Sequence, residues 1–164
     1  MGLFPGWRAP EFPLVIAGRA TTFHAWRREK WSVVLTRPAD FTPASLRCGI
    51  ASVDGNAVRL LGLCAPHTVP QGHVTAGAEF GGLHVVADPQ RKIEKIWAGP
   101  QMELGPAEPP IEEHAAYLIA PSGHIRRTLS FLPGTQQDFT TVLRTLASFD
   151  APFLLRDREL PYAA

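Results

Sequence analysis

Residues 37–49 read Arg37-Pro-Ala-Asp-Phe-Thr-Pro-Ala-Ser-Leu-Arg-Cys-Gly49, and this stretch decides the predicted fold. The apolar residues 31–35 before it predict a short buried strand, which ends at the first proline of the stretch. Thr42 and Pro43 predict a helix start, because threonine supplies a capping oxygen and proline tolerates the first helical position. Gly49 predicts the end of that helix. The predicted unit is therefore a strand, a turn and a short helix.

Ser45 lies in the first turn of this predicted helix. The first turn presents unpaired N–H groups and the positive end of the helix dipole, which make a cysteine there a reactive thiolate. A serine hydroxyl ionises far too high to benefit, and it cannot cycle through sulfenic acid and disulfide. The chemistry of this position therefore depends on which residue occupies it.

The pattern Pro38-x-x-x-Thr42-x-x-Ser45 resembles the peroxiredoxin motif Pro-x-x-x-Thr-x-x-Cys, with serine in the place of the peroxidatic cysteine. The string Pro-Ala-Asp-Phe-Thr-Pro is similar to the one-cysteine and alkyl hydroperoxide reductase branch. The likeness continues through residues 9–12, 22–26 and 86–93 and through the closing hairpin and helix. The resemblance implies a thioredoxin-like α/β fold in a single domain, residues 1–164, with a mixed central sheet flanked by helices. Because the tail through Tyr162 is short, we expect no separate C-terminal domain of the kind found in many one-cysteine peroxiredoxins.

Hydrophobic periodicity and turn residues predict the other elements. We expect a hairpin over 14–23, a helical or turn segment over 24–30, strands at 57–64 and 83–87, a weak helix ending near 81–82, a helix from Asp88, a loop over 101–110, a hairpin of 115–120 and 125–132, and an amphipathic helix over 135–148. The long family helix before the second central strand is expected to be shortened or lost, because Gly49 and a turn at 54–56 leave little room for it.

Ser45 has three interpretations: an engineered replacement of cysteine, a natural loss, or a plain hydroxyl at a helix start. Other positions that the resemblance marks also differ. His114 stands where the family has an arginine that holds the thiolate, and Arg37 stands where a histidine often precedes the motif proline. A second family arginine falls among residues 136–138, which hold none. Several coordinated differences favour natural divergence over a single engineered change.

The candidate catalytic residues are Ser45, Thr42, His114 and Arg37, and the candidate substrate-binding residues are Pro38, Phe41 and Trp97. A histidine at position 114 can act as a general acid or base near neutral pH, and the alternative is an exposed residue at a strand start. Thr42 serves equally well as a helix cap, and Asp40 is interpreted as a turn former.

Cys48, three residues after Ser45, is a possible displaced nucleophile, with a buried packing cysteine as the alternative. Cys64 ends a predicted buried strand and is interpreted as packing. His67 and His73 flank a proline loop, but no carboxylate or cysteine at ligand spacing joins them. We therefore expect neither a metal nor another cofactor.

The 164 residues carry a net charge of +1, which gives no electrostatic footprint for nucleic acid. No apolar run is long enough to span a bilayer, and the N-terminus does not read as a signal peptide. Two cysteines do not form a disulfide framework, so a reducing cytoplasm is expected. The expected partners are a small-molecule ligand or substrate and a second copy in a homodimer, paired through the edge strand at 125–132.

Three functions remain open. The first is a degenerate peroxiredoxin-like protein that has lost the thiol-peroxidase cycle and binds or transforms a small organic molecule in the ancestral pocket. The second is a thiol-dependent peroxidase, either with an engineered serine at 45 or with Cys48 in its role. The third is a non-catalytic binding protein that kept only the fold.

Overall fold

The computed structural model describes residues 3–16, 18–64, 79–80, 83–88, 92–97, 114–132 and 135–149. The predicted loop at 101–110, His67, His73 and the C-terminal tail lie outside these residues. Every statement about the structure below concerns the described residues.

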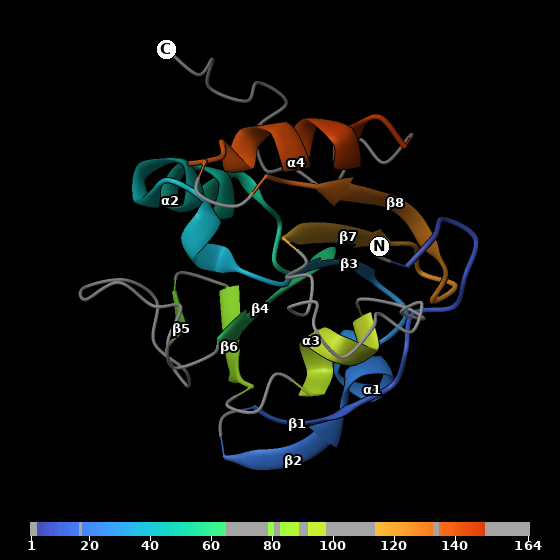
Figure 1. Ribbon diagram of the computed structural model, residues 1–164. Helices are drawn as coiled ribbons and strands as arrows, with labels where there is room; N and C mark the ends of the chain where they lie inside the picture. The colour runs from blue at the N-terminus through green and yellow to red at the C-terminus, as the bar shows by residue number, and fades with distance from the viewer. Residues whose placement is uncertain are drawn as a thin grey trace, which may run out of the picture.

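A mixed sheet of six strands forms the centre of the molecule, in the order β5-β6-β4-β3-β7-β8 (Figure 1). β3 pairs in parallel with β4, and β4 pairs in parallel with β6, whereas β7 is antiparallel to both β3 and β8. The strands are β3 (Trp31–Leu35), β4 (Val58–Cys64), β5 (Glu79–Phe80), β6 (Leu83–Ala87), β7 (Ala115–Ile119) and β8 (Ile125–Ser130). A separate hairpin consists of β1 (Pro13–Ile16) and β2 (Arg19–Thr22). The predicted α/β class with a mixed central sheet is confirmed.

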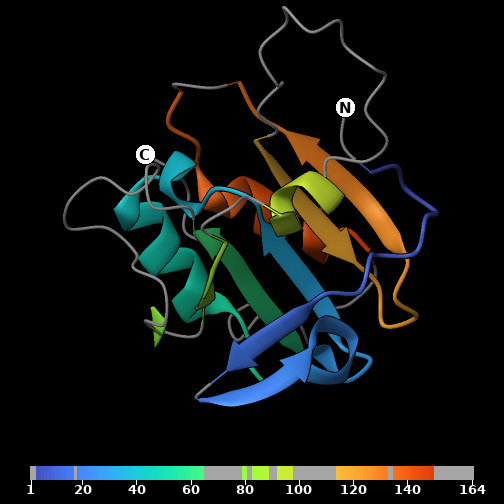
Figure 2. The ribbon, with the colours of Figure 1, turned by 60° about the horizontal axis from the view of Figure 1, so that its bottom comes forward.

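Helices cover both faces of this sheet. They are α1 (Phe23–Arg27), the 3₁₀ turn η1 (Pro38–Asp40), α2 (Pro43–Ser52), α3 (Lys92–Trp97) and α4 (Phe139–Ala147). α2 and α4 lie on one side of the sheet, and α1 and α3 lie on the other (Figures 1 and 2). Successive strand residues point to opposite faces, so β3 supplies Val33 and Leu35 to the first core and Val34 to the second.

The prediction that the motif helix ends at Gly49 is wrong, and the helix before β4 is not lost. α2 runs ten residues, from Pro43 to Ser52. Gly49 lies inside this helix. A side chain is disfavoured there, because a Cβ atom would stand 2.4 Å from Phe139 Cδ1 of α4. The glycine therefore allows the two helices to approach each other, and it does not end the first.

Replacing Gly49 with alanine is expected to lower the free energy of unfolding by up to about 2 kcal/mol. Overpacking costs ~1–3 kcal/mol, and the gain of about 1 kcal/mol in helix propensity offsets only part of that cost. Phe139 is fully buried, so its ring cannot turn out into solvent. Urea denaturation measures the change. Gly55→Ala is the matched control, because its Cβ would meet nothing within 4 Å. Equal stability of the two variants would contradict the close approach.

One further expectation is corrected, and another falls partly outside the described residues. Residues 79–80, the described part of the weak helix predicted to end near 81–82, form the strand β5 and pair with β6. The helix predicted from Asp88 is described from Lys92 as α3, and the Asp88 carboxylate accepts a hydrogen bond from the Ile93 N–H at 3.2 Å.

Candidate functional site

The motif stretch follows the carboxyl end of β3, where it forms η1 and then α2. Arg37 and Pro38 are both buried. Pro38 packs on β4, since a Cβ added to Gly62 would lie 2.5 Å from the Pro38 ring. A glycine on β4 is thus required for the motif proline to lie against the sheet.

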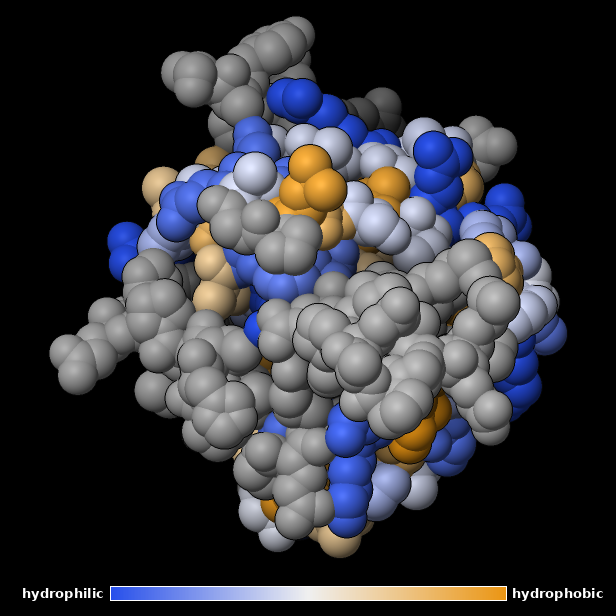
Figure 3. Space-filling view, in the orientation of Figure 1, coloured by the Kyte–Doolittle hydropathy of each residue, from blue (hydrophilic) through white to orange (hydrophobic). Residues whose placement is uncertain are grey.

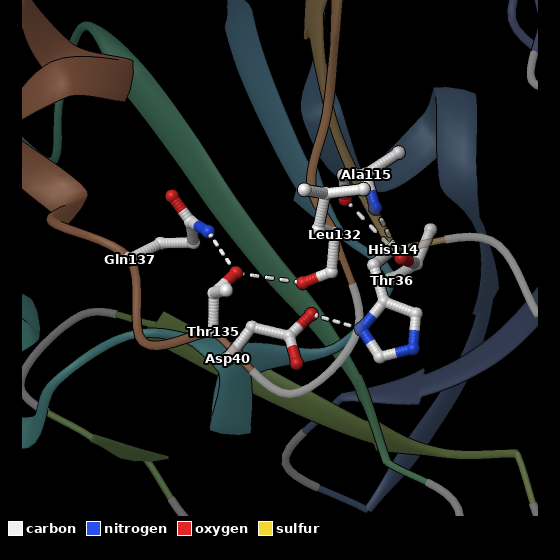
Figure 4. Close-up of polar contacts among 7 residues, drawn as sticks. All are labelled: Thr36, Asp40, His114, Ala115, Leu132, Thr135 and Gln137. Atoms are coloured by element: carbon white, nitrogen blue, oxygen red, sulfur yellow. Dashed lines mark hydrogen bonds and ion pairs between the residues drawn. The ribbon is translucent and has the colours of Figure 1, made fainter.

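Asp40 and His114 form a buried pair at this end of the sheet (Figure 4). His114 Nδ1 lies 2.6 Å from Asp40 Oδ2, and the two side chains are 7% and 13% exposed. A carboxylate only accepts, so the imidazole donates from Nδ1. The alternative of an exposed His114 is wrong. The interpretation of Asp40 as a turn former is incomplete, because its side chain also holds the histidine.

Thr36 fixes the strand start beside His114. Its hydroxyl donates to the Ala115 carbonyl at 3.2 Å and accepts from the Ala115 N–H at 2.9 Å. Its own N–H donates to the same carbonyl at 3.0 Å. These contacts join the end of β3 to the first residue of β7, so the position of His114 is set by backbone on both sides (Figure 4).

The segment before α4 is attached to the same stretch. The Gln137 N–H donates to the Asp40 carbonyl at 2.7 Å, and the Thr42 N–H donates to the Gln137 carbonyl at 3.0 Å. The Gln137 side chain donates to the Thr135 hydroxyl, which in turn donates to the Leu132 carbonyl, each at 2.7 Å. Asp40 is therefore held from three directions: by η1, by His114 and by the approach to α4.

The Ser45 hydroxyl is engaged by main chain on two sides. It donates to the Thr42 carbonyl at 2.9 Å and accepts from the Phe139 N–H at 3.1 Å. The Thr42 hydroxyl accepts from the Ser45 N–H at 3.3 Å, which makes Thr42 the N-cap of α2. Ser45 therefore connects the first turn of α2 to the first turn of α4.

Ser45→Ala is expected to lower the free energy of unfolding by about 1–3 kcal/mol, because the N–H of the buried Phe139 loses its acceptor. Ser52→Ala is the matched control. The Ser52 hydroxyl also bonds main chain within α2, but it is exposed, so its loss should change stability by no more than about 0.5 kcal/mol. Thermal or urea denaturation compares the two. Indistinguishable variants would show that Ser45 does not connect the helices.

Trp97 does not line the same site as Phe41, and its predicted role as a wall of the pocket is wrong. Trp97 is fully buried on the α1 and α3 side, where it contacts Phe12, Phe23 and Tyr117 edge-on. Phe41 is buried on the other side of the sheet, edge-on to Phe131 and Phe139. The central sheet separates the two rings.

Cys48 is exposed, so its interpretation as a buried packing residue is wrong. The side chain of Cys64 lies outside the description. In the described part of the chain, no three histidine, cysteine, aspartate or glutamate side chains gather into a possible metal site. No helix there is long and apolar enough to cross a membrane.

The pairing of Asp40 with His114 was missed from the sequence, because 74 residues separate them. The order of the strands in the sheet would have indicated this pair. β7 pairs antiparallel with β3, and Leu35 opposes Ala116. The residues just after β3 must therefore lie beside those just before β7. Strand order, which periodicity alone does not give, was the missing information.

No protein-family profile matches the sequence, and no curated protein matches it. Several solved structures are similar to this chain. A yeast mitochondrial 1-Cys peroxiredoxin is 17% identical, with a TM-score of 0.61 over 92% of this chain and 78% of that one. AhpC of Mycobacterium tuberculosis is also 17% identical, with a TM-score of 0.61 over 94% and 97%. A cysteine-to-serine mutant of peroxiredoxin 6 of Arenicola marina is 19% identical, with a TM-score of 0.62 over 91% and 74%. The chain has the fold of the peroxiredoxins.

Proposed function

We propose that this protein binds a small organic molecule at the peroxiredoxin-type site and acts on it by proton transfer at His114, without a thiol cycle. One observation carries the proposal. The Ser45 hydroxyl is engaged by two main-chain groups, while Asp40 and His114 form a buried pair beside the same helix start. Residue 45 then has a structural role, and the ionisable chemistry lies with the pair.

In this proposal Asp40 orients the imidazole through Nδ1, as the carboxylate does in many acid–base sites. Nε2 is then the atom that exchanges a proton with the ligand. Arg37, buried immediately before the motif proline, provides positive charge for an oxygen-rich group. Thr42, Pro38 and Phe41 shape the neighbouring backbone and apolar surface.

A suitable probe is 2-phenyl-2-propanol, which has the shape of an aryl-substituted alkyl hydroperoxide but lacks the O–O bond. Calorimetry on the unmodified protein should detect binding. His114→Gln should weaken it about tenfold, the cost of losing one hydrogen bond near a charged group. His124→Gln is the matched control, because His124 is exposed in the β7–β8 turn. Equal affinity in both variants would exclude His114 from the site.

Asp40→Asn separates proton transfer from simple binding. The amide keeps the shape of the carboxylate but not its charge. We expect this variant to bind the probe with nearly unchanged affinity. We expect the rate of any proton transfer catalysed at the site to fall. If the unmodified protein and Asp40→Asn bind the probe equally well and neither catalyses proton transfer, the protein is a non-catalytic binder.

The exposure of Cys48 favours a second candidate function, a peroxidase that uses this thiol.

We also expect a homodimer. β8 is an edge strand, but the start of this edge is covered by the chain's own N-terminal segment, since the Ile125 N–H donates to the Trp7 carbonyl and the Gly6 N–H to the Ile125 carbonyl. Pairing must therefore use the later part of β8 and its surroundings. Figure 3 shows a group of hydrophobic atoms in the region of α4 and β8, and Leu132 is 75% exposed.

Light scattering at micromolar concentration should give twice the mass of one chain. A dimer that is stable at this concentration is expected to bury more than about 1,000 Å² in total. Leu132→Lys should shift the mass toward one chain. Val15→Lys is the matched control, because Val15 is also exposed but belongs to the β1–β2 hairpin. A mass of one chain at every concentration would contradict the dimer.

A further inference from the structure

A pocket of about 520 Å³ lies between α1 and the turn that joins β7 to β8. β7 runs antiparallel to β3, so this turn lies near the start of β3, at the opposite end of the sheet from Asp40. Figures 1 and 2 both place the turn beside α1 and the N-terminal segment. The pocket is lined by Arg8, His24, Arg27, Glu29, Pro121 and Ser122.

Arg27 provides a fixed, buried positive charge in this wall. Its side chain is 2% exposed and makes four hydrogen bonds: to His24 Nδ1 and to the carbonyls of Lys30, Ala120 and Pro121. Among the described residues no carboxylate forms an ion pair with it. Burial lowers the pKa of the Arg27 guanidinium, and the nearby Arg8 lowers it further, whereas Glu29 and Glu11 raise it; arginine stays protonated. The charge is thus held in place by three main-chain carbonyls and the His24 ring.

Gly123 brings three groups together at the pocket. It has a φ of +90°, and an added Cβ would lie 3.1 Å from Arg8 Nη1, 3.3 Å from His24 Cε1 and 3.4 Å from Arg27 Nη2. Arg8 itself is exposed, with one long bond of 3.5 Å to the Ser122 carbonyl. Its guanidinium is therefore free to turn toward a ligand.

His24 adds no charge to the pocket. Its Nδ1 accepts from Arg27 Nε, so Nε2 carries the hydrogen and donates to the Ala9 carbonyl at 2.7 Å. With both nitrogens used, the ring is neutral. Two arginines and one glutamate then leave the lining with a net charge of +1.

We propose that this pocket binds the phosphate group of a small phosphate monoester. Arg8 contacts the phosphate oxygens, and Arg27 supplies the fixed charge behind them. Ser122 lines the pocket, with its hydroxyl 3.2 Å from His124 Nδ1. A phosphate carries close to two negative charges, so it gains more from two arginines than a carboxylate does and prevails over the repulsion of Glu29. The pocket has room for an organic group beyond the phosphate. This site is independent of the function proposed for Asp40 and His114.

The test is an NMR titration of the ¹⁵N-labelled protein at constant ionic strength, with glycerol 3-phosphate, inorganic phosphate, acetate and chloride as separate probes. The amides of Ser122 and Gly123 should shift and saturate with glycerol 3-phosphate in the millimolar range. Inorganic phosphate should bind more weakly, and acetate and chloride should cause no saturable shift. Equal binding of both phosphates would identify the free ion as the ligand and overturn the monoester.

Three variants with single charge changes test the assignment. Arg8→Gln should weaken binding about fivefold, and Glu29→Gln should tighten it by a similar factor. Arg144→Gln, an exposed change on α4, is the matched control and should leave the affinity unchanged. The spectra themselves report whether each variant is folded. Saturation by acetate, or the same affinity in all three variants, would overturn the proposal.

Discussion

The unmodified protein is expected to consume hydrogen peroxide no faster than buffer when dithiothreitol or thioredoxin is the reductant. A serine at position 45 cannot form a sulfenic acid, and its hydroxyl is engaged by the Thr42 carbonyl and the Phe139 N–H. Cys48 is exposed, but it lies a full turn beyond the helix start, where the dipole effect has faded. The expected difference from an active peroxiredoxin is therefore several orders of magnitude.

The yeast mitochondrial 1-Cys peroxiredoxin, which shares the fold, is a suitable positive control. Turnover comparable to that of the control would contradict the expectation. In that case Cys48→Ala identifies the source. Loss of turnover would assign the activity to Cys48, whereas retained turnover would point to another residue.

Ser45→Cys alone is expected to leave peroxide reduction slow, about 10²–10³-fold below an active peroxiredoxin. The resemblance implies an arginine that stabilises the thiolate, and one such donor is worth ~2.7–4 kcal/mol in a developing charge. His114 stands at that position and is paired with the Asp40 carboxylate. The Phe139 N–H would favour the thiolate, but the Thr42 carbonyl on the other side would oppose it.

The measurement is the thiol pKa of Ser45→Cys, together with its rate of oxidation by peroxide. We expect a pKa close to that of an ordinary cysteine. The double variant Ser45→Cys/His114→Arg should show a lower thiol pKa and faster oxidation. A strongly depressed pKa with rapid oxidation in the single variant would show that the site remains competent for peroxidase chemistry.

The central strands were predictable because their local chemistry is unambiguous. Short apolar runs bounded by prolines, glycines and polar residues gave 31–35 and 83–87 with the bounds that the structure has. The Thr-Pro helix start was predictable for the same reason, since its cap bond is local. These elements depend on neighbours in sequence and not on tertiary contacts.

The wrong predictions concern residues whose role depends on a partner that is distant in the sequence. Gly49 fits a helix end by sequence, but its role is set by Phe139 on another helix. Trp97 was predicted to be an apolar wall of the pocket, but the face of the sheet on which it lies depends on packing. The Asp40–His114 pair needed the order of strands in the sheet. The cover over the start of β8 comes from the N-terminal segment, more than a hundred residues away in sequence.

The most direct test of the claim that Asp40 and His114 form the functional centre is ¹⁵N NMR of histidine-labelled protein during titration with 2-phenyl-2-propanol. The account predicts a saturable shift of the His114 imidazole, strongest at Nε2, which is altered in Asp40→Asn. The resonances of His24 and His124, at the other end of the sheet, should stay unchanged. No shift at His114, or a shift confined to the other histidines, would contradict the account.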